Sequence, residues 1–196
     1  MVRGAVDPDA FEAIETFVGS CRAWGRVSNL VSAADQDRLW QRHVLDSLQL
    51  LPLADAAGPE WIDLGSGGGF PGMIVAIARR GTRMTLVESN RKKAAFLLQV
   101  AAASGASVRV EPKRIEAVTP GARDVVSARA LASLDKLLDL SAGFFGPSTI
   151  GLFPKGRDAA NEVAEARKRY DFALSETPSR TEADATILTV SQMTKV

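Results

Sequence analysis

The sequence predicts an α/β domain in which helices cover both faces of a mostly parallel sheet. Three observations lead to this fold class. After residue 58, short apolar runs alternate with helix-length segments, as in parallel strands joined by crossover helices. A cluster of glycines follows the first apolar run, where a strand would turn into a helix. The chain ends in two strand-like segments with no helix between them, which indicates an antiparallel hairpin and a sheet of seven strands.

An N-terminal helical extension, residues 1–57, is predicted to pack on the single domain at 58–196. Apolar residues recur at steps of three and four from Phe11 to Trp24 and again from Leu39 to Leu51, which predicts two helices. Residues 26–37 between them are predicted to form a loop. In the domain the predicted elements alternate as strands 61–64, 84–87, 108–110, 125–126 and 149–153, helices 71–80, 91–104, 131–143 and 158–169, and hairpin strands 170–174 and 186–190.

The composition excludes several classes of protein. Of 196 residues 46% are hydrophobic, and the net charge of +1 argues against bulk attraction to nucleic acid or membrane while leaving room for a local basic patch. One cysteine and one histidine are too few for most zinc sites, which need about four ligands. With no apolar leader or membrane span, we expect a cytoplasmic monomer without metal, and a buried, unreactive Cys21.

The glycine turn indicates a nucleotide site. Four of the five residues 65–69 are glycine, and Pro71 follows as a good first helical position. Glycines let backbone amides approach a ligand that a Cβ would exclude, and the helix start behind them favours electron-rich groups. The pattern G-x-G-x-x-G is weak evidence alone, because dehydrogenases and methyltransferases both use such turns. The residues assigned to the turn are Gly65, Ser66, Gly67, Gly69 and Phe70.

Two carboxylates favour S-adenosylmethionine over a nicotinamide cofactor. Asp63 precedes the first glycine, where it can meet a positively charged methionine group directly or through water. Glu88 ends the next strand, where such folds place an acid on the ribose hydroxyls. After the third strand, Ile115 is expected to stack on adenine and Glu116, or a neighbouring backbone amide, to read its exocyclic amine. For Glu116, an ordinary acid at a helix start remains an equal interpretation.

Six ordered motifs resemble the bacterial 16S rRNA guanine-N7 methyltransferase family, also called glucose-inhibited division protein B. The resemblance covers roughly residues 24–155 and departs from the family pattern at Val31, Ser66 and Gly68. The motifs are Asn29-Leu30-Val31-Ser32, Arg42-His43-Val44-Leu45-Asp46-Ser47, Asp63 to Gly72, Lys113-Arg114-Ile115-Glu116, Ser127-Ala128-Arg129-Ala130 and Lys155-Gly156.

The resemblance implies a Rossmann-like class I methyltransferase that uses S-adenosyl-L-methionine to methylate N7 of the guanine at position 527 of 16S rRNA, free or in the 30S subunit. It implies cofactor contacts at Gly65, Phe70, Ile115, Glu116 and Arg129. It also implies that the RNA-side residues include Arg42, His43, Arg114, Arg129 and Lys155.

Several roles stay open at this stage. For His43, a hydrogen bond that ties the N-terminal helices to the domain is favoured over catalysis. The basic run 91–93 has two interpretations, an RNA contact or a solvated helix face. Guanine N7 has an unshared electron pair in the ring plane, so no general base is required and no catalytic residue is assigned.

Other activities remain as alternatives. A methyltransferase of another RNA or of a small molecule is compatible with the fold. An NAD-dependent oxidoreductase would need a catalytic set such as Tyr-Lys, and the only tyrosine, Tyr170, lies on a late strand.

Overall fold

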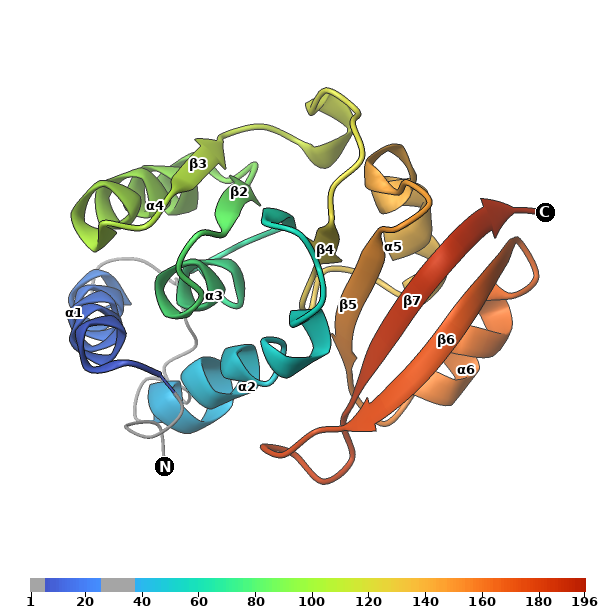
Figure 1. Ribbon diagram of the computed structural model, residues 1–196, viewed down its shortest axis with the longest axis horizontal. Coiled ribbons are helices and arrows are strands. Elements are labelled where there is room, and N and C mark those ends of the chain that lie inside the picture. The colour runs from blue at the N-terminus through green and yellow to red at the C-terminus, as the bar shows by residue number, and fades with distance from the viewer. Residues whose placement is uncertain (1–5, 26–37) are drawn as a thin grey trace.

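The computed structural model, which describes residues 6–25 and 38–196, contains a seven-stranded sheet between two layers of helices (Figure 1). The strand order is β3-β2-β1-β4-β5-β7-β6. The first five strands pair in parallel, and β7 runs antiparallel to both of its neighbours. The predicted fold class and the hairpin ending are therefore confirmed. In chain order the main elements are α1 (Pro8–Gly25), α2 (Leu45–Leu48), β1 (Glu60–Leu64), α3 (Gly72–Ala78), β2 (Arg83–Val87), α4 (Arg91–Ser104), β3 (Val108–Glu111), β4 (Val125–Ser127), α5 (Leu134–Ser141), β5 (Ile150–Lys155), α6 (Ala159–Ala166), β6 (Tyr170–Pro178) and β7 (Thr186–Lys195).

Local sequence signals explain where these elements begin and end. The α4 helix has the predicted bounds because the Asn90 side chain accepts hydrogen bonds from the amides of Lys92 and Lys93, and because Gly105 takes the left-handed conformation after its last turn. The α3 helix begins at Gly72, with Pro71 in the capping position. Short 3-10 turns cover Pro52–Ala54, Ile115–Ala117 and Ala142–Phe144.

The second N-terminal helix departs from the prediction of one regular helix. Residues Trp40–Val44 form a π-helical turn, η3, before α2 begins. The amide of Leu45 donates to the Trp40 carbonyl five residues earlier, and the Ser47 hydroxyl donates to the His43 carbonyl at 2.6 Å. Apolar spacing over so few residues cannot separate a π turn from an α turn. Such widened turns are frequent at functional sites.

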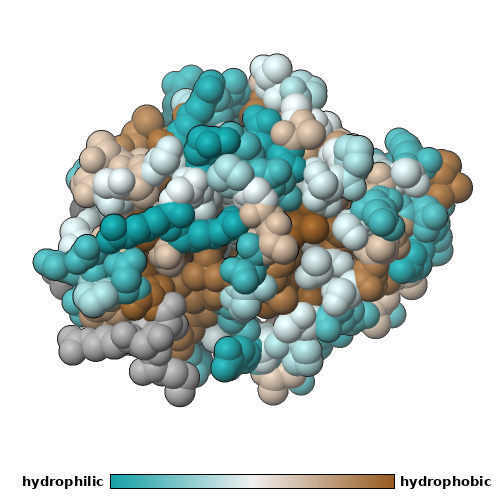
Figure 2. All heavy atoms as spheres, viewed as in Figure 1, coloured by the Kyte–Doolittle hydropathy of each residue, from teal (hydrophilic) through white to brown (hydrophobic). Residues whose placement is uncertain are grey.

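The alternation of β1 divides the core into two parts. Trp61 lies in the apolar cluster formed with α1, α2, α3 and α4, whereas Ile62 and Leu64 lie in the cluster with α5 and α6. The α1 helix contributes five buried side chains to the first cluster, so the N-terminal residues share the core of the sheet. Figure 2 shows hydrophilic and apolar side chains intermixed on one face of the molecule. No helix in the described ranges is long and apolar enough to cross a membrane.

Cys21 is buried, as predicted, and its thiol lies 3.9 Å from the carbonyl oxygen of Gly68. Burial raises the pKa of this thiol to about 12, so its reactive thiolate is scarce at neutral pH. We expect the folded protein to resist iodoacetamide at pH 8 and Cys21→Ala to retain activity. Mass spectrometry and a methyl-transfer assay check both. Rapid alkylation without unfolding would contradict this expectation.

Candidate functional site

The glycine turn lies at the carboxyl edge of the parallel strands and has a strained backbone that only glycine tolerates well. Gly65, Gly67 and Gly69 have φ angles of 67°, 57° and 94°. The amide of Ser66 donates to the Val87 carbonyl at 3.0 Å, and its hydroxyl donates to the Asp63 carbonyl at 2.9 Å. The turn is therefore fastened to the ends of β1 and β2.

A cavity of about 340 Å³ opens beside this turn. A Cβ at Gly65 would lie 2.7 Å from the Leu131 side chain, which shows why a larger residue would narrow the cavity. The predicted residues on its wall are Gly65, Gly67, Glu88, Arg114, Ile115 and Glu116, and sequence reasoning missed Ala130, Leu131 and Leu140. Ala130 belongs to the motif Ser127-Ala128-Arg129-Ala130, but no role was assigned to it, and no residue pattern distinguished Leu131 and Leu140 from ordinary helix and loop positions.

Glu88 is buried, and the glycine turn orients its carboxylate. Its Oε2 accepts a hydrogen bond from the Gly67 amide at 2.8 Å, and its Oε1 accepts one from the Asn90 amide at 2.7 Å. A carboxylate oxygen can accept a second hydrogen bond, so both Glu88 oxygens can still accept a hydrogen bond from a ligand in the cavity. This pair of acceptor oxygens fits a ligand with two adjacent hydroxyls, such as a ribose.

The other wall residues fit the remainder of a nucleoside. Ile115 is half-buried at the start of a 3-10 turn and offers an apolar surface for a base, while Glu116 beside it is exposed. Two predicted turn residues lie behind the cavity: a Cβ at Gly69 would meet Met73 and Phe17, and Ser66 is buried.

Asp63 lies beneath the turn and not on the cavity wall. It is fully buried, and its Oδ1 accepts a hydrogen bond from the Ser127 hydroxyl at 2.6 Å, which in turn accepts one from the Trp61 indole at 2.9 Å. A Cβ at Gly72 would lie 2.8 Å from Oδ2, so the carboxylate also packs against the start of α3. Its contact with a methionine group stays a prediction.

Desolvation raises the pKa of Asp63 from 3.8 to about 6, against the opposing hydrogen bond from Ser127. Between these values the folded state binds more protons than the unfolded state, so this group lowers the free energy of unfolding as pH rises from about 4 to about 6. Relative to wild type, we expect Asp63→Asn to gain up to about 3 kcal/mol over that window. Urea unfolding at several pH values measures this, with the exposed Asp184→Asn as control. Parallel stability curves for Asp63→Asn and wild type would refute it.

A second cavity of about 620 Å³ adjoins the first, and both include Ala130 on their walls. It is polar and lies between η3, the ends of β4 and β5, and the tip of the β6–β7 hairpin. Its charged and imidazole side chains are Arg38, Arg42, His43, Asp46, Arg129, Lys155, Glu162 and Glu182.

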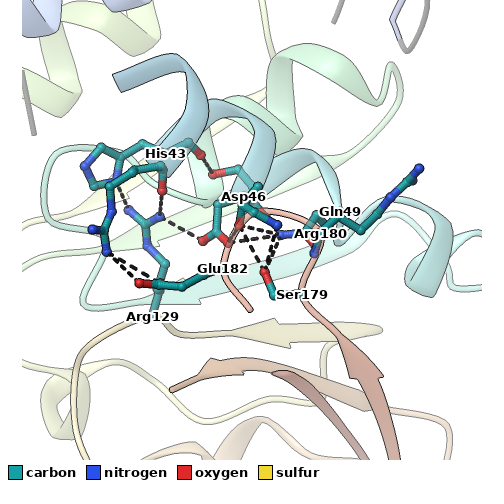
Figure 3. A network of polar contacts seen from close by, with 10 residues as sticks. His43, Asp46, Gln49, Arg129, Ser179, Arg180 and Glu182 are labelled. Carbon is teal, nitrogen blue, oxygen red and sulfur yellow. Dashed lines mark hydrogen bonds and ion pairs between the residues drawn. The ribbon is translucent and has the colours of Figure 1, made fainter. Parts of the chain in front are cut away.

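Arg129 is held from several sides by the π-helical turn and by α2, which follows it (Figure 3). Its guanidinium donates to the His43 Nδ1 at 2.7 Å, the Asp46 carboxylate at 3.0 Å and the Arg42 carbonyl at 3.1 Å. Its Cζ also lies 5.8 Å from the centre of the Phe70 ring. An arginine has no acceptor, so Nδ1 of His43 must be unprotonated. His43 thus joins the N-terminal segment to the domain, as predicted.

The hairpin tip completes this cavity and was missed by sequence reasoning. The Thr181 hydroxyl donates to Asp46 at 2.9 Å, and the Arg180 amide donates to the Gln49 side chain at 2.6 Å. These partners lie about 130 positions apart in the chain. No local sequence pattern predicts a contact between segments so far apart in the chain.

Lys155 lines the same cavity with its ammonium already engaged. It donates to the Ala132 carbonyl at 2.6 Å and pairs with Glu162 at 2.7 Å, while Glu162 also accepts from the Leu134 amide. The structure therefore uses Lys155 to join β5 to the start of α5. Its predicted RNA contact stays a prediction.

Several other features predicted from the sequence, in the part of the chain that the structure describes, do not line the polar cavity. Tyr170 donates to Asp139 on the α5 side, with no nicotinamide-type catalytic set around it among the described residues. Arg91 and Lys92 are exposed at the start of α4, where only Lys93 of the basic run lines the first cavity. The motif at 29–32 lies outside the described residues.

Comparison with known proteins gives consistent matches over nearly the whole chain. The family model described as rRNA small subunit methyltransferase G matches residues 10–187. Proteins named ribosomal RNA small subunit methyltransferase G are similar to this chain: that of Methylorubrum populi is 46% identical, covering 97% of this chain and 92% of the relative, and that of Parvibaculum lavamentivorans is 43% identical, covering 94% and 84%. A crystal structure of a mutant of MtNAS in complex with S-adenosylmethionine is similar in fold, with a TM-score of 0.62, 15% identity and coverage of 93% of this chain and 71% of that one.

Proposed function

Because this chain belongs to the rRNA small subunit methyltransferase G family, we propose that it transfers a methyl group from S-adenosylmethionine to N7 of a guanine in 16S rRNA, at position 527. One observation supports this most directly: the cavity that holds Glu88 and the polar cavity that holds Arg129 meet at Ala130. A cofactor in the first cavity and a base in the second would therefore be neighbours.

The first cavity would hold the nucleoside part of the cofactor. Glu88 would accept hydrogen bonds from both ribose hydroxyls, and Ile115 would cover one face of the adenine. The backbone amides of the glycine turn would lie against the rest of the cofactor. When bound, S-adenosylmethionine supplies an electrophilic methyl group. Asp63 would act from beneath, by holding β1, β4 and the start of α3 in register through Ser127.

The chain's contribution to the reaction is positioning. Guanine N7 already has a free electron pair, so no side chain has to remove a proton. His43 is consistent with this, because the nitrogen that would act as a base already accepts from Arg129. Holding two reactants in line is worth about 7–11 kcal/mol in favourable cases.

Arg129 would form part of the wall of the polar cavity that receives the base. It follows β4 directly, and three acceptors and the Phe70 ring restrict its guanidinium. A guanine in an rRNA loop must be splayed out of its stack to reach such a cavity, as readers of single-stranded RNA require. We propose that Arg129 lies against this base or its phosphate, in a cytoplasmic enzyme that acts as a monomer.

A methyl-transfer assay tests the function. The purified protein is incubated with tritiated S-adenosylmethionine and either 30S subunits lacking the modification or naked 16S rRNA. We expect label in at least one RNA, at a single guanine that aniline cleavage after borohydride treatment locates at N7. No label in either RNA would exclude the proposed substrate. Calorimetry with S-adenosylmethionine and NAD separately tests the cofactor.

A further inference from the structure

The polar cavity is lined by three ion pairs, each of which joins a cation to a carboxylate of the protein. Arg129 pairs with Asp46 at 3.0 Å, Lys155 with Glu162 at 2.7 Å, and Arg42 with Glu182 at 3.2 Å. An anionic ligand that binds any of these three cations must therefore compete with a carboxylate already in place. The burial of each ion pair and its other hydrogen bonds determine which carboxylate the ligand can displace.

Two of the pairs are buried and have further partners. The side chains of Arg129 and Asp46 are each 17% exposed, and that of Lys155 is 7% exposed. Arg129 also donates to His43 and to the Arg42 carbonyl, and Lys155 to the Ala132 carbonyl. Separating either pair would leave a buried charge without its counter-ion, which is strongly unfavourable. These two pairs therefore stay closed when a ligand binds.

The third pair is open to solvent. The Arg42 side chain is 39% exposed and that of Glu182 is 58% exposed. Both carboxylate oxygens of Glu182 approach one guanidinium nitrogen, at 3.2 and 3.5 Å. Exposed pairs of this kind contribute little to stability. A guanidinium binds a phosphate as well as it binds a carboxylate, so a phosphate can replace Glu182 here.

The hairpin tip that carries Glu182 is fastened at other points. Thr181 donates to Asp46. The Arg180 amide donates to Gln49 (Figure 3). Glu182 can therefore turn its side chain into solvent while the backbone of the tip keeps its place. Displacement requires no rearrangement of the cavity.

We propose that Arg42 is a binding subsite for a backbone phosphate of the RNA, and that Glu182 occupies this subsite until the RNA displaces it. The inference rests on the proposed function, because it takes the ligand of this cavity to be RNA. Glu182 thereby lowers the affinity for RNA and disfavours polyanions that cannot reach the rest of the site.

Filter binding of a labelled, unmodified 16S rRNA transcript tests the proposal over a range of salt concentrations. We expect Glu182→Gln to bind about twofold to fivefold more tightly than wild type, the equivalent of one exposed ion pair. The slope of log affinity against log salt should change little, because the contact between Arg42 and the phosphate forms in both proteins, whereas loss of that contact would flatten the slope by about 0.7. Asp184→Asn is the matched control, because it removes the same charge from an exposed position two residues along the same loop.

A double-mutant cycle locates the effect at Arg42. Arg42→Gln should weaken RNA binding and flatten the salt slope, and adding Glu182→Gln to it should then bring no gain beyond that of Asp184→Asn. Thermal unfolding verifies that each variant folds, and Arg42→Met, which also removes the charge, replaces Arg42→Gln if the latter does not. Equal effects of Glu182→Gln and Asp184→Asn, or a gain that persists without Arg42, would overturn the proposal. Failure of the proposed function is distinguishable, because wild type itself would then label no RNA.

Discussion

Replacing Arg129 with alanine lowers kcat/KM for methyl transfer to 16S rRNA by at least about a hundredfold, equivalent to about 3 kcal/mol of lost transition-state stabilisation. The change removes the guanidinium where the two cavities meet and leaves the Asp46 carboxylate and the His43 ring without their shared donor. When catalysis depends on alignment, a small displacement of the base relative to the methyl group lowers the rate of transfer strongly. Initial rates at varied RNA concentration measure the effect.

The controls for this variant separate chemistry from folding. Arg83→Ala removes an arginine from an exposed pair with Glu60 at the opposite end of the sheet, and should leave the rate unchanged. Arg129→Lys keeps the charge but cannot reach three acceptors at once, so its activity should lie between those of wild type and Arg129→Ala. Near-normal methylation by a folded Arg129→Ala protein would remove Arg129 from the substrate side.

Replacing Glu88 with alanine weakens S-adenosylmethionine binding by roughly a hundredfold, since two hydrogen bonds to a charged group contribute about 3 kcal/mol or more. The variant also leaves the amides of Gly67 and Asn90 without their acceptor, so the glycine turn loses its support. Calorimetric titration with the cofactor measures the affinity directly.

Glu116 provides a comparison within the same cavity. It is exposed, so Glu116→Ala should reduce cofactor affinity much less than Glu88→Ala does. Glu88→Gln keeps one acceptor oxygen and should fall between the two. An unchanged affinity for Glu88→Ala would mean that the cofactor does not use this carboxylate.

The sequence predicted the sheet well because each strand and each crossover helix has its own local signal. The positions of the glycine turn and of Glu88 could also be predicted, because both follow a parallel strand and the carboxyl ends of parallel strands lie at one edge of the sheet. That reasoning correctly brought Glu88, Ile115 and Gly65 to one cavity.

Contacts between distant segments could not be predicted in the same way. The pairing of Lys155 with Glu162 and the burial of Asp63 under the turn depend on side-chain directions that spacing does not specify. The hairpin tip around Thr181 reaches Asp46 only because β7 lies between β5 and β6. An alternating apolar pattern indicates a hairpin but not which strand it joins.

The position of β7 also has a consequence for the order in which the strands of the sheet can pair. β5 is the last parallel strand in the sheet, and its outer edge is covered by β7, Thr186–Lys195. β6 is synthesised earlier, yet it joins the sheet only through β7. Without the pairing of Thr186–Lys195, β5 therefore exposes an unpaired edge and the hairpin tip beside Arg42 is not fixed. The polar cavity is therefore complete only after β7 has paired with β5, so a sheet that has assembled all of its parallel strands still lacks one wall of that cavity.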